Sequence, residues 1–333
     1  MEEPELTNAV ETMNSDPLLN KTELPLRAVY HPLGFTVELA TNCHDVLAAA
    51  EESWGRFEKA FSEPALELRI GVVGDGSREC PPSPIFRAQR NLLSIIADVH
   101  NFVVCDLRQG FAFGWVTQAA VDYRAYLRYH FLEAATLCLL ESLYAVALHA
   151  ACVKTAGHGV LLCGDSGAGK SSLAFACARA GWTYISDDTI DLLHNRQDRF
   201  VVGNPHQIRF RESAARLFPE LHGESITPRA AGKPSIELPT ARLPEIVTAD
   251  NCLVDYIVFL NRQEPDPPGL APFPRDIAMQ RFEQSLITVG EIREIQAASL
   301  RNLLSVDVLE LRYSDLDWAV ERLEQLVAQG GNI

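Results

Sequence analysis

The chain has 333 residues, of which 47% are hydrophobic and 22% charged, and its formal net charge at pH 7 is −15. This length and apolar content are sufficient for two compact units. The negative charge argues against a general binder of nucleic acid or of an anionic membrane, because both partners would be repelled. The eight cysteines include no C-x-x-C pair and no zinc-site spacing, which favours buried thiols in a reducing compartment over a metal centre.

The N-terminal third of the chain predicts a flexible segment and then a small α+β module. Residues 1–24 begin with an acidic stretch that lacks the basic and apolar regions of a signal peptide. We therefore expect this segment to be flexible and the chain to remain in the cytoplasm. Residues 25–120 alternate strand-like runs with a helix predicted at 44–61, so they are typical of an α+β module of unknown role.

The strands of this module are predicted at 26–30, 35–40, 66–73, 102–106 and 111–116. Phe111, Phe113 and Trp115 alternate with small residues in the last of these strands, which places the three aromatic rings on one face. Packing is favoured over ligand binding for such a stripe.

Residues 121–333 predict a second, larger domain that starts with a buried helix from Tyr123 to about Ala147. The apolar run around this helix is interrupted by Glu133, Glu141 and His149. A membrane span is therefore not expected. Two strands should follow, at 149–154 and 159–163, joined by a glycine-containing turn.

The second of these strands leads into a complete phosphate-binding pattern, G-x-x-x-x-G-K-[ST], known as the P-loop or Walker A pattern. It consists of Gly164, Asp165, Ser166, Gly167, Ala168, Gly169, Lys170 and Ser171, and Ser172 follows in a predicted helix that stops at Gly181. Glycines let the backbone N–H groups approach phosphate, a lysine places positive charge on it, and a serine hydroxyl can ligate Mg²⁺. The order strand, loop and helix favours a nucleotide phosphate site over an incidental turn.

Two adjacent carboxylates follow one helix and one strand later. Residues 182–186 are aromatic and β-branched and predict a strand that ends at Asp187 and Asp188. Beside a bound magnesium–triphosphate, one carboxylate can face the metal while the other accepts a proton from an attacking hydroxyl. The alternative is that the pair opens a solvated turn.

These residues resemble the HPr kinase/phosphorylase catalytic domain family. The resemblance is carried by Leu148-His149-Ala150-Ala151, by the loop from Gly164 to Ser171, and by the segment from Ala180 to Asp188. It implies a P-loop domain of the HPr kinase and phosphoenolpyruvate carboxykinase type, and transfer of a phosphoryl group from ATP to a serine hydroxyl.

Carried over by position, the resemblance implies Asp187 as general base, Lys170 on the phosphates, Ser171 and Asp188 in the metal environment, and His149 nearby. The loop from Gly164 to Ser172 would hold ATP. His149 has a second interpretation as a core histidine, because an apolar run precedes it.

The sequence also departs from the family. Ala180 stands where the family has Arg, and the glycine-rich signature I-E-x-R-G-x-G is not visible in the comparable stretch, 203–212. Arg209 and Arg211 in that stretch can face phosphate, but alternating charge favours a solvated strand face. Lys233 is either a phosphate ligand or a surface loop residue. The identity of the acceptor and any reverse, phosphorylase activity therefore stay open.

The C-terminal part predicts a strand at 253–260, a loop at 263–274 that contains five prolines, and an amphipathic helix from a capping box at 314–317 to Gly330. The proline-rich loop fits a lid, a subunit contact or a plain surface excursion. A homo-oligomer is left open.

The sequence thus predicts an ATP- and Mg²⁺-dependent kinase that phosphorylates a serine hydroxyl of a protein or peptide, with no nucleic-acid or membrane partner. Two alternatives remain, a non-catalytic ATP-binding regulator and a kinase of a small molecule. The second shares the same site and differs only in the acceptor.

Overall fold

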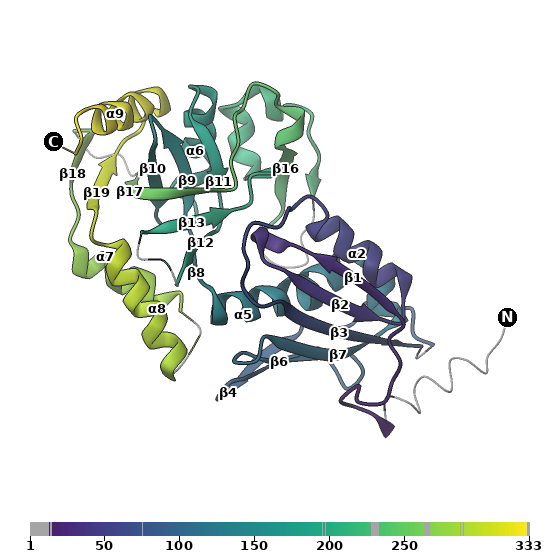
Figure 1. Ribbon diagram of the computed structural model, residues 1–333. Helices are drawn as coiled ribbons and strands as arrows, with labels where there is room; N and C mark the ends of the chain where they lie inside the picture. The colour runs from purple at the N-terminus through teal and green to yellow at the C-terminus, as the bar shows by residue number, and fades with distance from the viewer. Residues whose placement is uncertain are drawn as a thin grey trace. The chain divides into compact units, whose positions relative to one another are not determined.

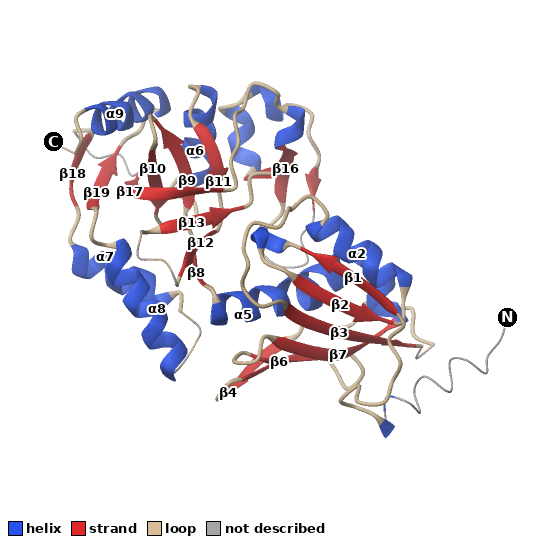
Figure 2. Cartoon of the chain, in the orientation of Figure 1, coloured by secondary structure: helices blue, strands red, loops and turns tan. Residues whose placement is uncertain are grey.

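The computed structural model describes residues 13, 15–74, 76–194, 196, 198–227, 233–262, 267–286, 288 and 290–331. These residues form two compact units, one ending at Leu143 and the other starting at Tyr144. The sequence predicted this boundary near residue 120. The structure places it later because helix α5 (Ala134–Leu143) packs against the sheet of the first unit. Both units combine sheets and helices, as the predicted α/β and α+β classes require (Figure 2).

The first unit is a mixed sheet with helices packed on it (Figure 1). Its strands are β1 (Leu26–Tyr30), β2 (Val37–Thr41), β3 (Leu66–Val73), β4 (Ile85–Gln89), β5 (Leu92–Ile96), β6 (Phe102–Asp106) and β7 (Phe111–Thr117). They lie in the order β1-β2-β3-β7-β6-β5-β4, in which β3 is parallel to both β2 and β7. Its helices are α2 (His44–Trp54), α3 (Gln118–Asp122), α4 (Arg124–Leu127) and α5, with a π-helical turn at Arg128–Glu133.

Three features of this unit differ from the sequence predictions. The helix α2 ends at Trp54 rather than near residue 61, because Gly55, a poor helix former, follows it. The hairpin β4–β5 was not predicted, because every residue of β4 is exposed and no alternating pattern marks the strand. In the segment predicted to be flexible, Leu19 and Leu24 are buried in a cluster with Trp115. Residues 1–12 and 14 of that segment lie outside the described residues.

The aromatic stripe on β7 packs, as its alternation predicted. Trp115 is 1% exposed, and the rings of Phe111 and Phe113 stack with centroids 5.9 Å apart. Phe113 also packs against the cluster around Trp115.

The second unit is built on a larger sheet (Figure 1). The strands of this sheet are β8 (Ala145–Leu148), β9 (Ala151–Thr155), β10 (His158–Cys163), β11 (Thr183–Ser186), β12 (Ile190–Leu193), β13 (Phe200–Gly203), β17 (Asn251–Asn261), β18 (Gly269–Pro272) and β19 (Asp307–Arg312). A smaller sheet contains β14 (Gln207–Phe210), β15 (Ile226–Thr227) and β16 (Ser235–Pro239). The helices are α6 (Lys170–Arg179), α7 (Arg275–Gln284), α8 (Gly290–Leu303) and α9 (Leu316–Ala328).

Strand directions decide where the site can form. The order along one part of the larger sheet is β11-β9-β10-β17-β19-β18, and the start of β17 continues the sheet through β13, β12 and β8. The strand β10 is parallel to β17, and β17 is parallel to β19. Because β9 is antiparallel to both β10 and β11, β11 also runs in the direction of β10. The carboxyl ends of β10, β11, β17 and β19 therefore meet at one edge of the sheet, where ligands of open α/β sheets bind.

Helices cover both faces of this part of the sheet. Val160 and Leu162 of β10 belong to a core cluster with residues of α6 and α9. The alternate residues Leu161 and Cys163 belong to a second cluster, with residues of α7 and α8. The near-continuous apolar sequence of β10 reflects this burial on both faces.

Two sequence predictions about this unit were wrong in part. The helix predicted to continue to Ala147 stops at Leu143, and Ala145–Leu148 forms β8, which pairs with β12. The periodicity of a short, wholly apolar run is the same whether it forms a helix or a strand, so the sequence could not distinguish the two. Within the predicted loop 263–274, Gly269–Pro272 forms the edge strand β18, a position in which proline is tolerated. Residues 263–266 of that loop lie outside the described residues.

The predicted closing helix is present as α9, and Asp315 caps it by accepting a hydrogen bond from the Trp318 N–H. Within the described part of the chain, every helix is too short or too polar to cross a bilayer.

Candidate functional site

The glycine loop, residues 164–169, joins the carboxyl end of β10 to the first residue of α6. Gly164 and Gly169 have positive φ angles of 146° and 101°. A Cβ atom on Gly169 would lie 2.5 Å from the Tyr313 hydroxyl, which itself donates to the Ala168 carbonyl oxygen at 3.2 Å. Only glycine fits this turn against Tyr313, and the turn sets the start of α6.

The tip of the loop is open to solvent. Asp165, Ser166 and Gly167 are exposed, whereas Ala168 and Ser172 are partly buried. The first intrahelical bond of α6 runs from the Leu173 N–H to the Gly169 carbonyl. The N–H groups of the first helical turn therefore have no acceptor within the helix and can face an anion.

Lys170, at the start of α6, is 6% exposed. Its ammonium donates to the Gly164 carbonyl at 2.8 Å and to the Asp165 carbonyl at 3.4 Å, and it lies 3.0 Å from His149 Nε2. Burial lowers the pKa of Lys170, and the nearby carboxylate of Asp188 opposes that shift. The lysine is thus held at the mouth of the loop.

His149 lies between β8 and β9, at the same sheet edge as the loop, because β9 runs antiparallel to β10. Its Nδ1 is 3.4 Å from Asp188 Oδ1, and its side chain is 54% exposed. Burial and the ammonium of Lys170 lower the pKa of His149. A neutral ring with its proton on Nδ1 satisfies both contacts, since it donates to Asp188 and accepts from Lys170. The exposure of the ring contradicts the interpretation of His149 as a core histidine.

Asp187 follows β11 and is 4% exposed. Its Oδ1 accepts from the Tyr184 hydroxyl at 2.9 Å, and its Oδ2 accepts from the Arg209 N–H at 3.1 Å. Burial, and then the neighbouring charge of Asp188, raise the pKa of Asp187 to about 6. This is the range in which a carboxylate works as a general base near neutral pH.

Tyr184 was not predicted to belong to the site. Its hydroxyl lies 2.9 Å from Asp187 Oδ1 and 3.0 Å from the Gln207 carbonyl oxygen, and a phenol can donate to only one of them at a time. The aromatic run of β11 was interpreted only as evidence for a strand, and the contact of this ring with the carboxylate three residues later was not predicted. A tyrosine on a buried strand just before an acidic pair is the signal that was available.

Asp188 is the more open of the two carboxylates, with 38% of its side chain exposed. Besides His149, it lies near Arg209, whose guanidinium is 3.7 Å from Asp188 Oδ2. The Ser171 hydroxyl donates to the backbone carbonyl of Asp187 at 3.5 Å, so the start of α6 and the aspartate pair are adjacent.

Two arginines of the 203–212 stretch also reach this edge. Arg209, on β14, pairs with Asp188 and with Glu237. Arg211 donates to the Ser166 hydroxyl at 3.0 Å. Arg209 is partly buried and Arg211 is exposed, so both side chains remain open to solvent while they make these contacts. Lys233 is exposed just before β16.

The site offers oxygen donors for a hard cation. The Ser171 hydroxyl and the Asp188 carboxylate are ligands that Mg²⁺ accepts, and it commonly adds phosphate oxygens and water to one or two carboxylates. Among the described residues, no group of three or more His, Cys, Asp or Glu side chains forms a metal cage. The donor set thus fits Mg²⁺ carried with a phosphorylated ligand.

The fold and the site define a class: a mixed α/β unit with a glycine loop, a buried lysine and two carboxylates at the carboxyl edge of its parallel strands. Residues 142–212 match the family model of the HPr Serine kinase C-terminal domain. The predicted resemblance to this family is thereby confirmed over the segment that contains His149, the glycine loop and both aspartates.

The curated relatives match over a short part of the chain. The chain is 40% identical over 62 residues to the HPr kinase/phosphorylase of Limosilactobacillus reuteri, which is 19% of this chain and 19% of that protein. It is 36% identical over 63 residues to the HPr kinase/phosphorylase of Halalkalibacterium halodurans. The match thus spans about a fifth of the length of these curated relatives. The structure of the Hpr(Ser) kinase/phosphatase from Coxiella burnetii aligns with 55% of this chain and 98% of its own, at 14% identity and a TM-score of 0.32.

Proposed function

We propose that this chain is an ATP- and Mg²⁺-dependent kinase of the HPr kinase type, which transfers the γ-phosphoryl group to a serine hydroxyl of a protein or peptide in the cytoplasm. The unit from Tyr144 onward would be its P-loop catalytic domain. The observation that carries the proposal is the meeting of the glycine loop, Lys170 and Asp187 at one sheet edge.

Each residue has a role that its surroundings support. The glycine loop and the start of α6 would bind the phosphates through backbone N–H groups, with the Lys170 ammonium close to the transferring group. Ser171 and Asp188 would hold Mg²⁺, which neutralises phosphate charge when bound. His149 would fix the positions of Lys170 and Asp188, because it contacts both.

The reaction balances with these residues alone. The acceptor oxygen forms a bond to the γ-phosphorus, the bond from that phosphorus to the bridging oxygen of ADP breaks, and the hydroxyl proton passes to the Asp187 carboxylate. Asp187 is suited to this step because burial raises its pKa to about 6, so it is ionised at pH 7 yet basic enough to accept a proton. Arg209 fixes one oxygen of this carboxylate through its backbone N–H.

The test is a transfer assay with γ-labelled ATP, Mg²⁺ and two sources of acceptor, a pool of serine-containing peptides and a cell extract. Lys170→Ala and Asp187→Asn should each reduce label transfer to serine by about 10²-fold or more. Asp250→Asn, which alters an exposed carboxylate of the same unit, is the matched control and should leave transfer unchanged.

Two results would overturn the proposal. One is transfer that survives both Lys170→Ala and Asp187→Asn. The other is nucleotide binding that depends on Lys170 but is accompanied by no transfer to any acceptor, which would assign the chain to ATP-binding regulators.

A further inference from the structure

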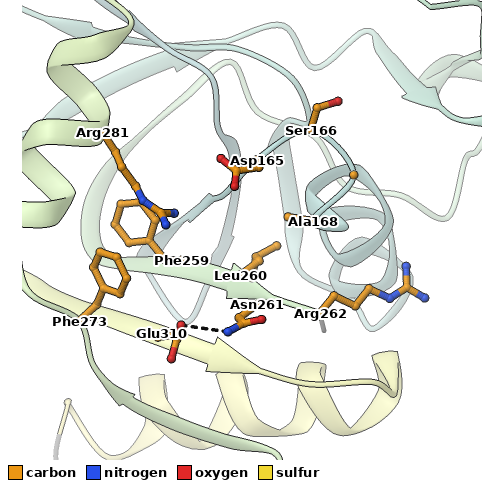
Figure 3. A pocket seen from close by; sticks show the side chains of 11 residues that line it. Asp165, Ser166, Ala168, Phe259, Leu260, Asn261, Arg262, Phe273, Arg281 and Glu310 are labelled. Carbon is orange, nitrogen blue, oxygen red and sulfur yellow. Dashed lines mark hydrogen bonds between the residues drawn. The ribbon is translucent and has the colours of Figure 1, made fainter. Parts of the chain in front are cut away.

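A cavity of about 470 Å³ opens beside the glycine loop and has no role in the transfer step described above. Its volume lies within the roughly 300–1,000 Å³ of small-molecule sites. The residues that line it come from the loop, from the end of β17, from β19, from the segment between β18 and α7, and from the last turn of α7. They include Asp165, Phe259, Asn261, Phe273, Arg281 and Glu310 (Figure 3).

The cavity and the aspartates lie on opposite sides of the loop. In the strand order β11-β9-β10-β17-β19, the loop follows β10, the aspartates follow β11, and the cavity is formed at the ends of β17 and β19. We call these the β11 side and the β17 side. A nucleotide that lies on the loop with its terminal phosphate facing Asp187 therefore extends its other end into the β17 side.

One wall of the cavity is suited to a planar ring. Phe259 and Phe273 stack with centroids 4.4 Å apart and planes inclined by 20°. The guanidinium carbon of Arg281 lies 5.4 Å from the centroid of each ring. Figure 3 shows Arg281 beside this pair, at the same cavity as the loop residues. A guanidinium held over aromatic rings keeps its orientation and offers its planar face to a base.

The floor of the cavity is polar. The Asn261 side-chain amide donates to Glu310 Oε1 at 3.1 Å, and Glu310 Oε2 lies 3.8 Å from the guanidinium of Arg312. These contacts fix the carboxylate, which keeps lone pairs for further donors. Neighbouring hydroxyls, such as those of a ribose, are donors of the kind it accepts.

We propose that the β17-side cavity binds the nucleoside of the nucleotide whose phosphates lie on the glycine loop, with Arg281 stacked on the base and Glu310 accepting from the ribose hydroxyls. The inference rests on the proposed function, and it assigns nucleotide affinity to residues outside the 142–212 segment. An acceptor peptide fits this cavity less well, because the acceptor hydroxyl must reach Asp187 on the β11 side.

The experiment compares ligands with equal numbers of phosphates. Isothermal titration calorimetry on the full chain with Mg²⁺ measures the affinities of ADP and inorganic pyrophosphate. We expect ADP to bind at least about tenfold more tightly, and Arg281→Ala to remove most of this advantage while leaving pyrophosphate affinity unchanged. Arg281→Lys keeps the positive charge but lacks the planar guanidinium, so it should behave like Arg281→Ala.

Two further comparisons localise the effect. Glu310→Gln should weaken the binding of ADP more than the binding of 2′-deoxy-ADP, because only ADP carries both the 2′- and the 3′-hydroxyl. Arg301→Ala removes an exposed arginine of α8 in the same unit and should change nothing. Far-UV circular dichroism of each variant checks that it folds.

The inference is overturned if wild type binds ADP and pyrophosphate equally, if Arg281→Ala weakens both to the same extent, or if Arg281→Ala weakens only the binding of serine peptides. Failure of the proposed function looks different. Either Lys170→Ala leaves the affinities of both ligands unchanged, or the chain binds ADP as described here but transfers no label to any acceptor.

Discussion

The β11 side and the β17 side of the glycine loop form one edge of one sheet, yet they differ in chemistry. The β11 side contains His149, Asp187 and Asp188, joined to Lys170 and Tyr184 by polar contacts. The β17 side contains stacked rings with a guanidinium over them. Under the proposed function the β11 side would act on the transferred phosphoryl group, and the β17 side would bind the nucleoside of the nucleotide that carries it. Variants on the β11 side should therefore change turnover, and variants on the β17 side should change nucleotide affinity.

The largest difference between the two sides of the loop is expected for Asp188→Asn. Loss of this carboxylate removes charge from the proposed magnesium environment, and a bound metal contributes several kcal/mol of charge stabilisation to phosphoryl transfer. We expect kcat/KM to fall by on the order of a hundredfold at fixed Mg²⁺ and to recover partly as Mg²⁺ is raised. A magnesium titration of the transfer rate measures this.

The β17 side supplies the control for that titration. Arg281→Ala should raise the KM for ATP without changing the Mg²⁺ concentration needed for half-maximal rate. If Asp188→Asn and Arg281→Ala shift the magnesium dependence equally, the proposed division between the two sides is wrong.

A smaller and more selective effect is expected for Tyr184→Phe. The change removes one hydroxyl that donates to the Asp187 carboxylate and keeps the ring. A hydrogen bond to a charged group contributes about 1.5–3 kcal/mol, so we expect kcat to fall about tenfold while the KM for ATP stays the same. The donated hydrogen bond lowers the pKa of Asp187, so its loss should move the acid limb of the pH–rate profile to higher pH.

Tyr256→Phe is the matched control for this variant, because Tyr256 is a buried tyrosine of β17 in the same unit. It should leave both kcat and the pH profile as in wild type. A rise in KM with unchanged kcat in Tyr184→Phe would instead assign Tyr184 to nucleotide binding.

The two sides of the loop also differ in how far the sequence could predict them. The glycine loop, Lys170 and the aspartates lie within a short stretch with strict spacing, and local order was enough to foresee that β10, the loop, α6 and β11 bring them together. The contacts of Arg209 with Asp188 and of Arg211 with Ser166 were not predicted, because strand alternation says which residues share a face but not what that face meets. The cavity was not foreseen, since Phe259, Arg281 and Glu310 come from separate elements that only the parallel pairing of β17 and β19 unites.

Fold errors had a similar origin. The segment around Val146 was predicted as helix because a continuous apolar run shows neither helical nor strand periodicity. It forms a strand because it pairs with β12. The hairpin β4–β5 was not predicted because its exposed edge strand, β4, has no buried face and so no alternating hydrophobic pattern. Local propensity therefore located the phosphate loop better than it located the sheet partners.

The smallest effect on nucleotide binding is expected for another buried carboxyl of the same unit, Asp191 on β12, which is 2% exposed. Its Oδ1 finds no hydrogen-bond partner among the described residues, and burial raises its pKa to about 7. A carboxyl with a raised pKa in the folded state stabilises the fold most below the unfolded pKa, near 4, and that contribution is lost as pH rises through about 7.

Asp191→Asn removes this titration. Each unit of pKa difference corresponds to about 1.4 kcal/mol, less the cost of burying an amide without full hydrogen bonding, so we expect the variant to be more stable than wild type by about 1–2 kcal/mol at pH 8. Below about pH 3 the carboxyl is largely neutral in both states, so this advantage of the variant should disappear. Urea unfolding across this pH range measures the difference, and ADP affinity should stay constant throughout. A stability difference that does not vary with pH would show that Asp191 is not a buried titrating group, whereas a change in ADP affinity would extend the nucleotide site beyond both sides of the loop.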